Sequence, residues 1–317
     1  MNPSSNPSAP RAAAAASRAL SIQDAAEILR GGGLVAFPTE TVYGLGANAL
    51  DPSAVRKIFE MKGRPETSPL IVHVASLEMA RGIVAEWPPL AEGLARQWWP
   101  GALTMVLPKD RRVPGSVTAG LPTVGVRMPN HPIALELIRE AGVPVAAPSA
   151  NRFTGLSPTS AEHVRAAFGD AVPVLDGGPC AVGIESTVVA IEGDHLKLLR
   201  PGMISLGEIE QAAAERGAAH PAPGMHEKHY SPRTRLILVH GPGELPDRTG
   251  AYVWRVALGP AARSLRMPLD AGPYASQLYR VLHQLDAENW PWIAVEIPPD
   301  APDWAPIRDR LRRAAGG

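Results

Sequence analysis

Short apolar runs alternate with amphipathic helical patterns along most of this 317-residue chain. Residues 34–37 (LVAF) and 70–74 (LIVHV) have the length and composition of strands, whereas Asp51 and Pro52 form a helix-start signal. Such alternation predicts an α/β fold. Several predicted strands follow one another with no helix between them. The sequence therefore favours a twisted mixed sheet with flanking helices over an all-parallel sheet.

Composition divides the chain into four segments. Residues 1–17 are rich in Asn, Pro, Ser and Ala, and they are predicted to be a disordered tail. Residues 18–216 carry the mixed α/β pattern, and residues 217–233, rich in Pro, Gly, Ala and His, are interpreted as a linker. Residues 234–317 predict strand, strand, helix and strand, which indicates a smaller Rossmann-like α/β domain.

Charge and cysteine content narrow the class of protein. Lys plus Arg number 31 and Asp plus Glu number 31, and residues 20–200 carry 16 basic against 18 acidic side chains. Charge therefore does not support direct contact with tRNA or other nucleic acid. The single cysteine, Cys180, excludes an intramolecular disulfide and a cysteine metal cluster. Because we find neither a stretch of about 18 apolar residues nor a secretory signal, we expect a cytoplasmic protein that does not enter a membrane.

Common nucleotide-binding motifs are missing. No lysine follows a glycine, so the chain has no P-loop. Residues 44–49 (GLGANA) imitate a dinucleotide fingerprint, but the next helix is predicted to begin only at Asp51 and Pro52. We interpret residues 44–49 as a tight turn and keep an NAD enzyme as a weaker alternative. The nine histidines have no zinc-binding spacing.

Six polar segments, rich in glycine and proline, are each expected just after a predicted strand, with residues 62–68 placed before the strand that holds His73. In open α/β sheets, ligands bind at the carboxyl ends of strands, and arginines suit carboxylate and phosphate groups. The segments are residues 38–46 (PTETVYGLG), 62–68 (KGRPETS), 123–129 (TVGVRMP), 147–152 (APSANR) with 157–159 (SPT), 183–187 (GIEST) and 199–202 (LRPG). Converging cations from them would suit a small anionic ligand together with a polyphosphate.

Taken singly, each candidate also has a structural interpretation. Lys62 and Arg64 could be solvated charges at a helix end, and His73 could be a hydrogen-bonded histidine inside a strand. Ser149 and Asn151 could be turn-forming residues. Their joint occurrence in one domain favours a binding site.

Taken together, these motifs resemble the L-threonylcarbamoyl-adenylate synthase family. The resemblance covers residues 20–233, and the motifs occur in the order and spacing of that family. They are PTETVYGLG at 38–46, KGRP at 62–65, WPG at 99–101, VRMP at 126–129, SAN at 149–151, ESTV at 185–188 and LRPG at 199–202. Residues 223–232 (PGMHEKHYSP) are similar to the linker of the long, two-domain form.

The resemblance implies that L-threonine, bicarbonate or CO2 and ATP react to give threonylcarbamoyl-AMP and pyrophosphate. This product would feed enzymes that transfer the threonylcarbamoyl group to tRNA. Mg2+ is expected as the cofactor, held by phosphate oxygens and water without a protein ligand. The second domain is expected to act as a lid or platform, with the linker crossing the nucleotide site.

The resemblance also implies a role for individual residues. The catalytic set is Lys62, Arg64, Ser149 and Asn151. The threonine pocket is Thr41, His73, Arg127, the backbone of Ala147, and Ser186. The nucleotide contacts are Arg64, Ser68, Thr123, Ser149, Ser157, Arg200 and Tyr230.

Two further readings keep this type of fold but change the function. One is an RNA-binding protein without catalysis, although the sequence shows neither a basic block nor an aromatic stripe. The other is a carbamoyl-phosphate enzyme, such as the related module of hydrogenase-maturation proteins. That module is accompanied by further domains for which this chain is too short.

Overall fold

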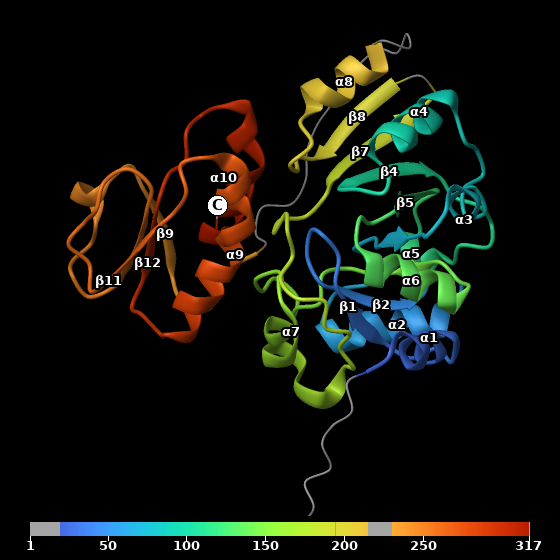
Figure 1. Cartoon of the computed structure of the whole chain (residues 1–317), viewed down its shortest axis with the longest axis horizontal. Coiled ribbons are helices and arrows are strands. Elements are labelled where there is room, and N and C mark those ends of the chain that lie inside the picture. Colours follow the sequence, from blue (N-terminus) through green and yellow to red (C-terminus); the bar gives the residue numbers. More distant parts are fainter. Residues whose placement is uncertain (1–19, 194, 215–229, 317) are drawn as a thin grey trace, which may run out of the picture.

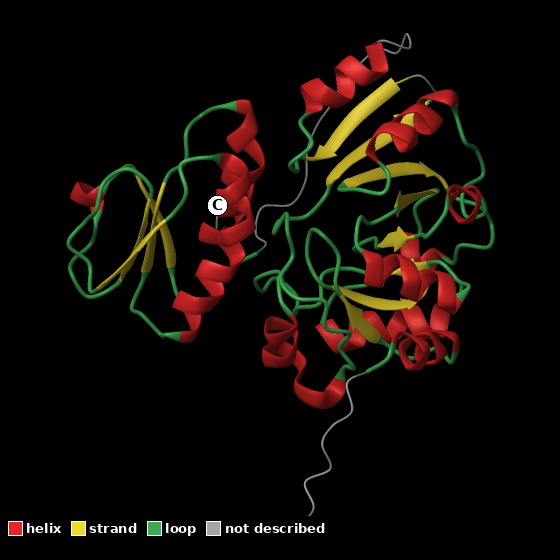
Figure 2. Ribbon diagram, in the orientation of Figure 1, coloured by secondary structure: helices red, strands yellow, loops and turns green. Residues whose placement is uncertain are grey.

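Two sheets, each covered by helices, build two α/β domains in the computed structural model (Figures 1 and 2). The structure describes residues 20–193, 195–214 and 230–316. The predicted tail and residues 217–229 of the predicted linker lie outside these residues. Within the described part of the chain, no helix has the length and apolar character that crossing a membrane would require.

The larger domain is built on an eight-stranded sheet. Its order is β1-β2-β6-β3-β5-β4-β7-β8, in which β3–β5 and β4–β7 are parallel and the other neighbours antiparallel. The prediction of a mixed sheet is therefore confirmed. The strands are β1 (Val35–Phe37), β2 (Gly44–Asn48), β3 (Ile71–His73), β4 (Leu103–Pro108), β5 (Thr123–Arg127), β6 (Val145–Ala146), β7 (Thr187–Glu192) and β8 (His195–Arg200).

Eight α-helices pack around this sheet in the described residues. Pro52 opens α2 as the sequence predicts, Ser21 caps α1, and Gly63 ends α2 in the left-handed conformation. The helices are α1 (Ile22–Arg30), α2 (Pro52–Lys62), α3 (Leu77–Arg81), α4 (Pro89–Trp98), α5 (Gly115–Thr118), α6 (Pro132–Ala141), α7 (Ala161–Phe168) and α8 (Leu206–Ala214).

Two predictions for this domain are wrong. Residues 44–49 do not form a tight turn, because Gly44–Asn48 is strand β2 and pairs with β1 and β6. Glycine is required there: a side chain on Gly46 would lie 2.8 Å from the Phe37 ring. Residues 159–162 (TSAE) also have the sequence pattern of a capping box that starts at Thr159, but α7 begins one residue later, after Ser160, without a side-chain cap.

The smaller domain has four parallel strands in the order β11-β10-β12-β9, which confirms the Rossmann-like prediction. Its elements are β9 (Leu236–Val239), β10 (Ala251–Trp254), β11 (Arg263–Arg266), α9 (Ala271–Ala287), β12 (Ile293–Glu296) and α10 (Ala305–Ala315). Helices α9 and α10 cover the side of the sheet that faces the larger domain (Figure 1). We did not predict β11 or α10 from the sequence.

The two domains share a hydrophobic core. Val42, Leu156 and Ile184 of the larger domain belong to the same buried cluster as Leu278 of α9. Gly183 allows the closest approach: its φ is +77°, and a Cβ there would lie 2.6 Å from Ser276 Cα of α9. The interface is therefore packed like a protein interior.

A stacked histidine pair in this interface should make stability depend on pH. The rings of His163 in α7 and His283 in α9 lie 3.9 Å apart. Burial, followed by the charge of His283, lowers the pKa of His163 to about 4, and burial also lowers the pKa of His283. An unfolded histidine has a pKa of about 6.5, so between these values the unfolded chain binds more protons.

The stabilising contribution of this pair is therefore complete above about pH 6.5 and is lost as the pH falls toward 4. We expect the melting temperature to fall over this range. A His163→Phe variant should show a flatter dependence, because phenylalanine keeps the ring but cannot be protonated. Calorimetry of both proteins across the range checks this, and identical pH profiles would contradict it.

Candidate active site

The candidate residues lie across one face of the larger sheet. Thr123, Gly125 and Arg127 alternate along β5 and so share a face, and His73 is the register partner of Arg127 on β3. Val124 and Val126 face the opposite side, where they join the main hydrophobic core. Ligand binding was expected at the carboxyl ends of strands. His73 and Arg127 are the last residues of the parallel strands β3 and β5, and Thr41 and Ser149 follow β1 and β6, whereas Thr123 begins β5.

Arg127 is fixed by three groups of the protein. Its Nε donates a hydrogen bond to the Gly101 carbonyl at 3.1 Å, and one terminal nitrogen donates to the Thr41 hydroxyl at 2.8 Å. Its other terminal nitrogen lies 2.6 Å from the Glu40 carboxylate, and both side chains are buried. The guanidinium is therefore held in one orientation beside Thr41.

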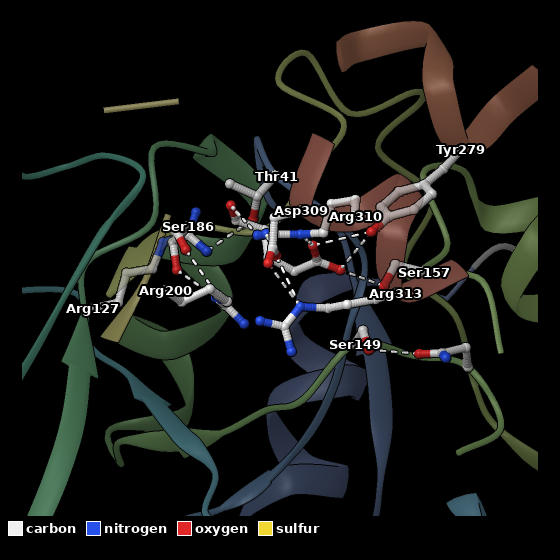
Figure 3. Close-up of polar contacts among 12 residues, drawn as sticks. Thr41, Arg127, Ser149, Ser157, Ser186, Arg200, Tyr279, Asp309, Arg310 and Arg313 are labelled. Atoms are coloured by element: carbon white, nitrogen blue, oxygen red, sulfur yellow. Dashed lines mark hydrogen bonds and ion pairs between the residues drawn. The ribbon is translucent and has the colours of Figure 1, made fainter. Parts of the chain in front are cut away.

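Ser186 and Arg200 form a second polar unit close to β5. The Ser186 hydroxyl lies 2.8 Å from that of Thr104. Arg200 donates to the Ser186 hydroxyl and to its carbonyl, each at 3.1 Å. Arg127, Ser186 and Arg200 gather on one side of the close-up, with Ser149 and Ser157 on the other (Figure 3). The segment 183–187 precedes β7, so the expectation that it follows a strand is wrong.

Lys62 connects the end of α2 to the loop after β6. Its Nζ donates to the Ser149 carbonyl at 2.6 Å and to the Asn151 carbonyl at 2.5 Å. The Ser149 hydroxyl in turn donates to the Asn151 side chain at 2.5 Å. Burial, with a smaller contribution from Arg64, brings the pKa of Lys62 well below its usual value. The KGRP and SAN motifs therefore form one structural unit.

Arg64 interacts electrostatically with Lys62, and also with Tyr230 and Arg200. Burial lowers the pKa of Arg64 to about 10, with Tyr230 opposing the shift and Arg200 adding to it. Arg64 donates to the Pro69 carbonyl at 3.1 Å, while its buried Nε has no hydrogen-bond partner among the described residues. The positive charge of Arg200 therefore adds to the lowering of the Arg64 pKa.

Three predicted contact residues, Ser157, Ala147 and Tyr230, already interact with other groups of the protein. The buried Ser157 hydroxyl donates to the Glu185 carboxylate. The backbone N–H of Ala147 donates to the Ile71 carbonyl at 2.9 Å, which leaves the Ala147 carbonyl as the group it offers to a ligand. The buried ring of Tyr230 lies beneath the Arg310 guanidinium at 5.3 Å.

Ser68 and Thr123 lie apart from this network. Both are at the amino ends of their strands, Ser68 before β3 and Thr123 at the start of β5. No hydrogen bond between their side chains and another candidate residue is found among the described residues. Thr123 and Arg127 share a face of β5 and are four residues apart, or about 13 Å at the usual rise per strand residue. A ligand that reaches both must be extended.

Sequence reasoning assigned no role to Glu40, Thr104, Glu185, Tyr279 or Arg310. The first three stand inside or beside the recognised motifs, and Tyr279 and Arg310 come from the smaller domain. A helical repeat of Ile307, Leu311 and Ala314 was the available signal for α10, which carries Arg310.

The donor set of this face favours anions over a metal ion. Among the described residues, no group of three or more His, Cys, Asp or Glu side chains could hold a metal. The candidate residues include Lys62, Arg64, Arg127 and Arg200 together with hydroxyls. Fold and site together define a two-domain α/β protein with cations and hydroxyls on one face of its larger sheet.

Comparisons with known proteins identify the family. The model described as "Telomere recombination" matches residues 27–202, and the model "Threonylcarbamoyl-AMP synthase, C-terminal domain" matches residues 204–316. The Threonylcarbamoyl-AMP synthase of Bacillus subtilis is 39% identical over 327 residues, covering 93% of each chain. That of Pyrococcus abyssi is 51% identical over 233 residues, covering 70% of this chain and 68% of the relative.

A solved structure agrees with this assignment. The crystal structure of P. abyssi Sua5 complexed with L-threonine superimposes with a TM-score of 0.85 at 40% identity. The match covers 93% of this chain and 94% of that one. The chain belongs to the threonylcarbamoyl-AMP synthase family.

Proposed function

We propose that this protein catalyses the ATP-dependent synthesis of L-threonylcarbamoyl-AMP, the first step of threonylcarbamoyladenosine modification of tRNA. The observation that carries the proposal is family membership across both domains, over 93% of the B. subtilis enzyme. The threonine complex of the P. abyssi relative supports L-threonine as the amino-acid substrate. The cationic face of the sheet supports anionic partners.

The reaction needs charge positioning more than a covalent nucleophile. The threonine amine adds to the carbon of CO2, or of bicarbonate with loss of water, and gives a carbamate. A carbamate oxygen then attacks the α-phosphorus of ATP, and the bond from this phosphorus to the pyrophosphate oxygen breaks. Both reactants are anions and repel each other, so Lys62, Arg64 and Arg200 would stabilise the charge as they approach.

Threonine would lie at the Arg127 end of the site. Arg127 would bind its carboxylate, and the Ala147 carbonyl would accept a hydrogen bond from its amine. Thr41, His73 and Ser186 would surround the side chain and its hydroxyl. This arrangement orients the amine toward the cations of the nucleotide half.

ATP would extend over the rest of the face. Arg64, Ser149 and Arg200 would contact the phosphates, with Lys62 and Asn151 fixing that loop. Ser68, Thr123, Ser157 and Tyr230 would line the remainder of the nucleotide site. A triphosphate with its nucleoside is long enough to link the two ends of β5, which an amino acid alone is not.

Mg2+ fits this site as a companion of ATP. The converging residues are cations and hydroxyls, so phosphate oxygens and water would supply its ligands. Bound there, the ion would neutralise phosphate charge. The product would pass to enzymes that transfer the threonylcarbamoyl group to tRNA in the cytoplasm.

The proposal is tested by mass spectrometry of the products made from ATP, Mg2+, L-threonine and bicarbonate. Threonylcarbamoyl-AMP should form with an equal amount of pyrophosphate, and both should disappear when threonine is omitted. An Arg64→Ala variant should lose product formation while remaining folded. If the folded wild-type protein makes neither product, RNA binding and the use of carbamoyl phosphate as a substrate are the hypotheses to test next.

Arg127→Lys should raise the KM for threonine roughly 10- to 100-fold, because a lysine loses the planar fork that binds a carboxylate. The variant keeps a positive charge beside the buried Glu40 but loses hydrogen bonds to Gly101 and Thr41, so the melting temperature should fall and must be measured to show that the protein stays folded. Steady-state kinetics with threonine and ATP varied separately checks this. An unchanged KM for threonine would rule out the carboxylate contact.

A further inference from the structure

One buried carboxylate joins the two domains beside the nucleotide half of the site. Glu185, in the segment before β7, accepts hydrogen bonds from Ser157 of its own domain and from Tyr279 of α9, the latter at 3.2 Å. Nε of Arg310 in α10 donates to the same carboxylate at 2.8 Å. Figure 3 labels the three donors, Ser157, Tyr279 and Arg310, which come from both domains.

Arg310 is the largest fully buried side chain of the described residues, and its side-chain exposure is 0%. One terminal nitrogen lies 2.8 Å from Asp309, and the guanidinium lies over the ring of Tyr230. Burial alone would raise the pKa of Glu185, but the charges of Arg310 and Arg200 hold it at about 2. The pair is therefore ionised in the interior of the protein.

Holding two domains together does not by itself explain such a pair. Removing two charges from water is costly, and apolar side chains of similar volume often stabilise a protein as well or better. The surrounding interface is already apolar, with Val42, Leu156 and Ile184 in one cluster. The role of the Glu185–Arg310 pair is therefore better inferred from its position than from how strongly it holds the two domains together.

Proposed nucleotide contacts lie around this pair. Ser157 donates to Glu185, Tyr230 lies under Arg310, and Arg200 binds Ser186, the residue next to Glu185. If the Glu185 carboxylate moved, the Ser157 hydroxyl and the 185–186 backbone that anchors Arg200 would move with it. The smaller domain thus reaches the nucleotide half of the site through one side chain.

We propose that Arg310 is a positioning residue of the nucleotide site, supplied by the smaller domain. Acting through Glu185, it fixes Ser157 and the anchor of Arg200, and it holds the ring of Tyr230 directly. The assignment of these three residues to ATP rests on the proposed function. The role of the smaller domain is then to complete the ATP site as well as to cover it.

The test compares four variants of the full-length protein. Arg310→Met removes the guanidinium group of Arg310. Arg310→Lys keeps the positive charge without the guanidinium group. Tyr279→Phe removes one neutral hydrogen-bond donor to Glu185. The double variant Arg310→Met with Glu185→Gln removes both charges, which should return stability toward that of the wild type. Arg312→Gln is the matched control, because Arg312 is an exposed arginine of the same helix.

We expect the KM for ATP to rise about tenfold or more in Arg310→Met and in the double variant, the loss typical of a charged hydrogen bond. The KM for threonine should stay within about threefold, which is less than one such bond is worth. Arg310→Lys should recover part of the ATP affinity. Tyr279→Phe should raise the KM for ATP a few-fold at most, the effect of one neutral hydrogen bond. The control should behave as the wild type.

Calorimetric titration with ATP in the absence of threonine separates this inference from the proposed function, because it requires no product. Weaker ATP binding by the double variant supports the inference even if no threonylcarbamoyl-AMP is formed. A double variant as stable as the wild type that binds ATP equally well overturns it, since Arg310 would then serve cohesion alone. If Arg310→Met does not fold, the Arg310→Lys and Tyr279→Phe titrations decide the question.

Discussion

Valine should be used at least about 10³-fold less efficiently than threonine, measured as kcat/KM, because it lacks the hydroxyl that a buried polar site is built to bind. Binding valine would leave polar groups of the pocket without partners, and that penalty is much larger than the loss of apolar contact. Serine lacks only a methyl group, which costs about 1–3 kcal/mol, so it should be a weak substrate.

His73 is the side chain to which we assign this discrimination. It is 4% exposed, and its Nδ1 is buried with no hydrogen-bond partner among the described residues. Burial, with the nearby charge of Arg127, lowers its pKa to about 3, so the imidazole is neutral at pH 7. A neutral ring can either donate to or accept from a hydroxyl at that nitrogen.

A His73→Leu variant should lose most of the preference for threonine over valine, because an apolar side chain no longer leaves an unpaired nitrogen beside valine. Competition assays that follow threonylcarbamoyl-AMP and its valine analogue by mass spectrometry measure this ratio. Valine turnover close to that of threonine in the wild type would refute the pocket. An unchanged ratio in the variant would move the discrimination to Thr41 or Ser186.

Lys62→Met should lower kcat by about 10²–10³-fold, the loss expected when a preorganised charge that stabilises a transition state is removed. Lys62 is 3% exposed, and its ammonium group is held in place by the carbonyls of Ser149 and Asn151. Methionine has a similar volume and no charge, which separates the loss of charge from the loss of packing.

Lys57→Met is the matched control. Lys57 lies on the same helix, and its Nζ donates to the Gly32 carbonyl at 2.7 Å, away from the Ser149 loop. Stopped-time assays of pyrophosphate release, with melting temperatures of both variants, check the prediction. A Lys62→Met protein that is folded and retains most of its turnover would remove Lys62 from the reaction.

The sequence predicted the fold class because strand and helix patterns are local. Runs such as residues 70–74 and the Asp51-Pro52 signal are determined by neighbouring residues, and both elements form where expected. β2 was missed because Gly44 and Gly46 resemble a turn. Their strand conformation depends on packing against Phe37 and pairing with β1.

The candidate site was also visible in the sequence, as motifs that the resemblance grouped together. Its geometry was not. Arg127 is held by Gly101, Thr41 and Glu40, and the most distant of these, Glu40, is 87 positions away in the sequence. No local pattern encodes such a contact, because it exists only once the strands have paired.

The sequence by itself determined the segments that carry the chemistry and the α/β class of both domains, since local periodicity and motif composition do not require a folded chain. Only the tertiary structure decided that the candidate site residues lie on one face of the larger sheet and that α10 of the smaller domain contacts Glu185 beside them. Glu185 and Arg310 are 125 residues apart, and an ion pair between them is stable only after two domains have packed and excluded water.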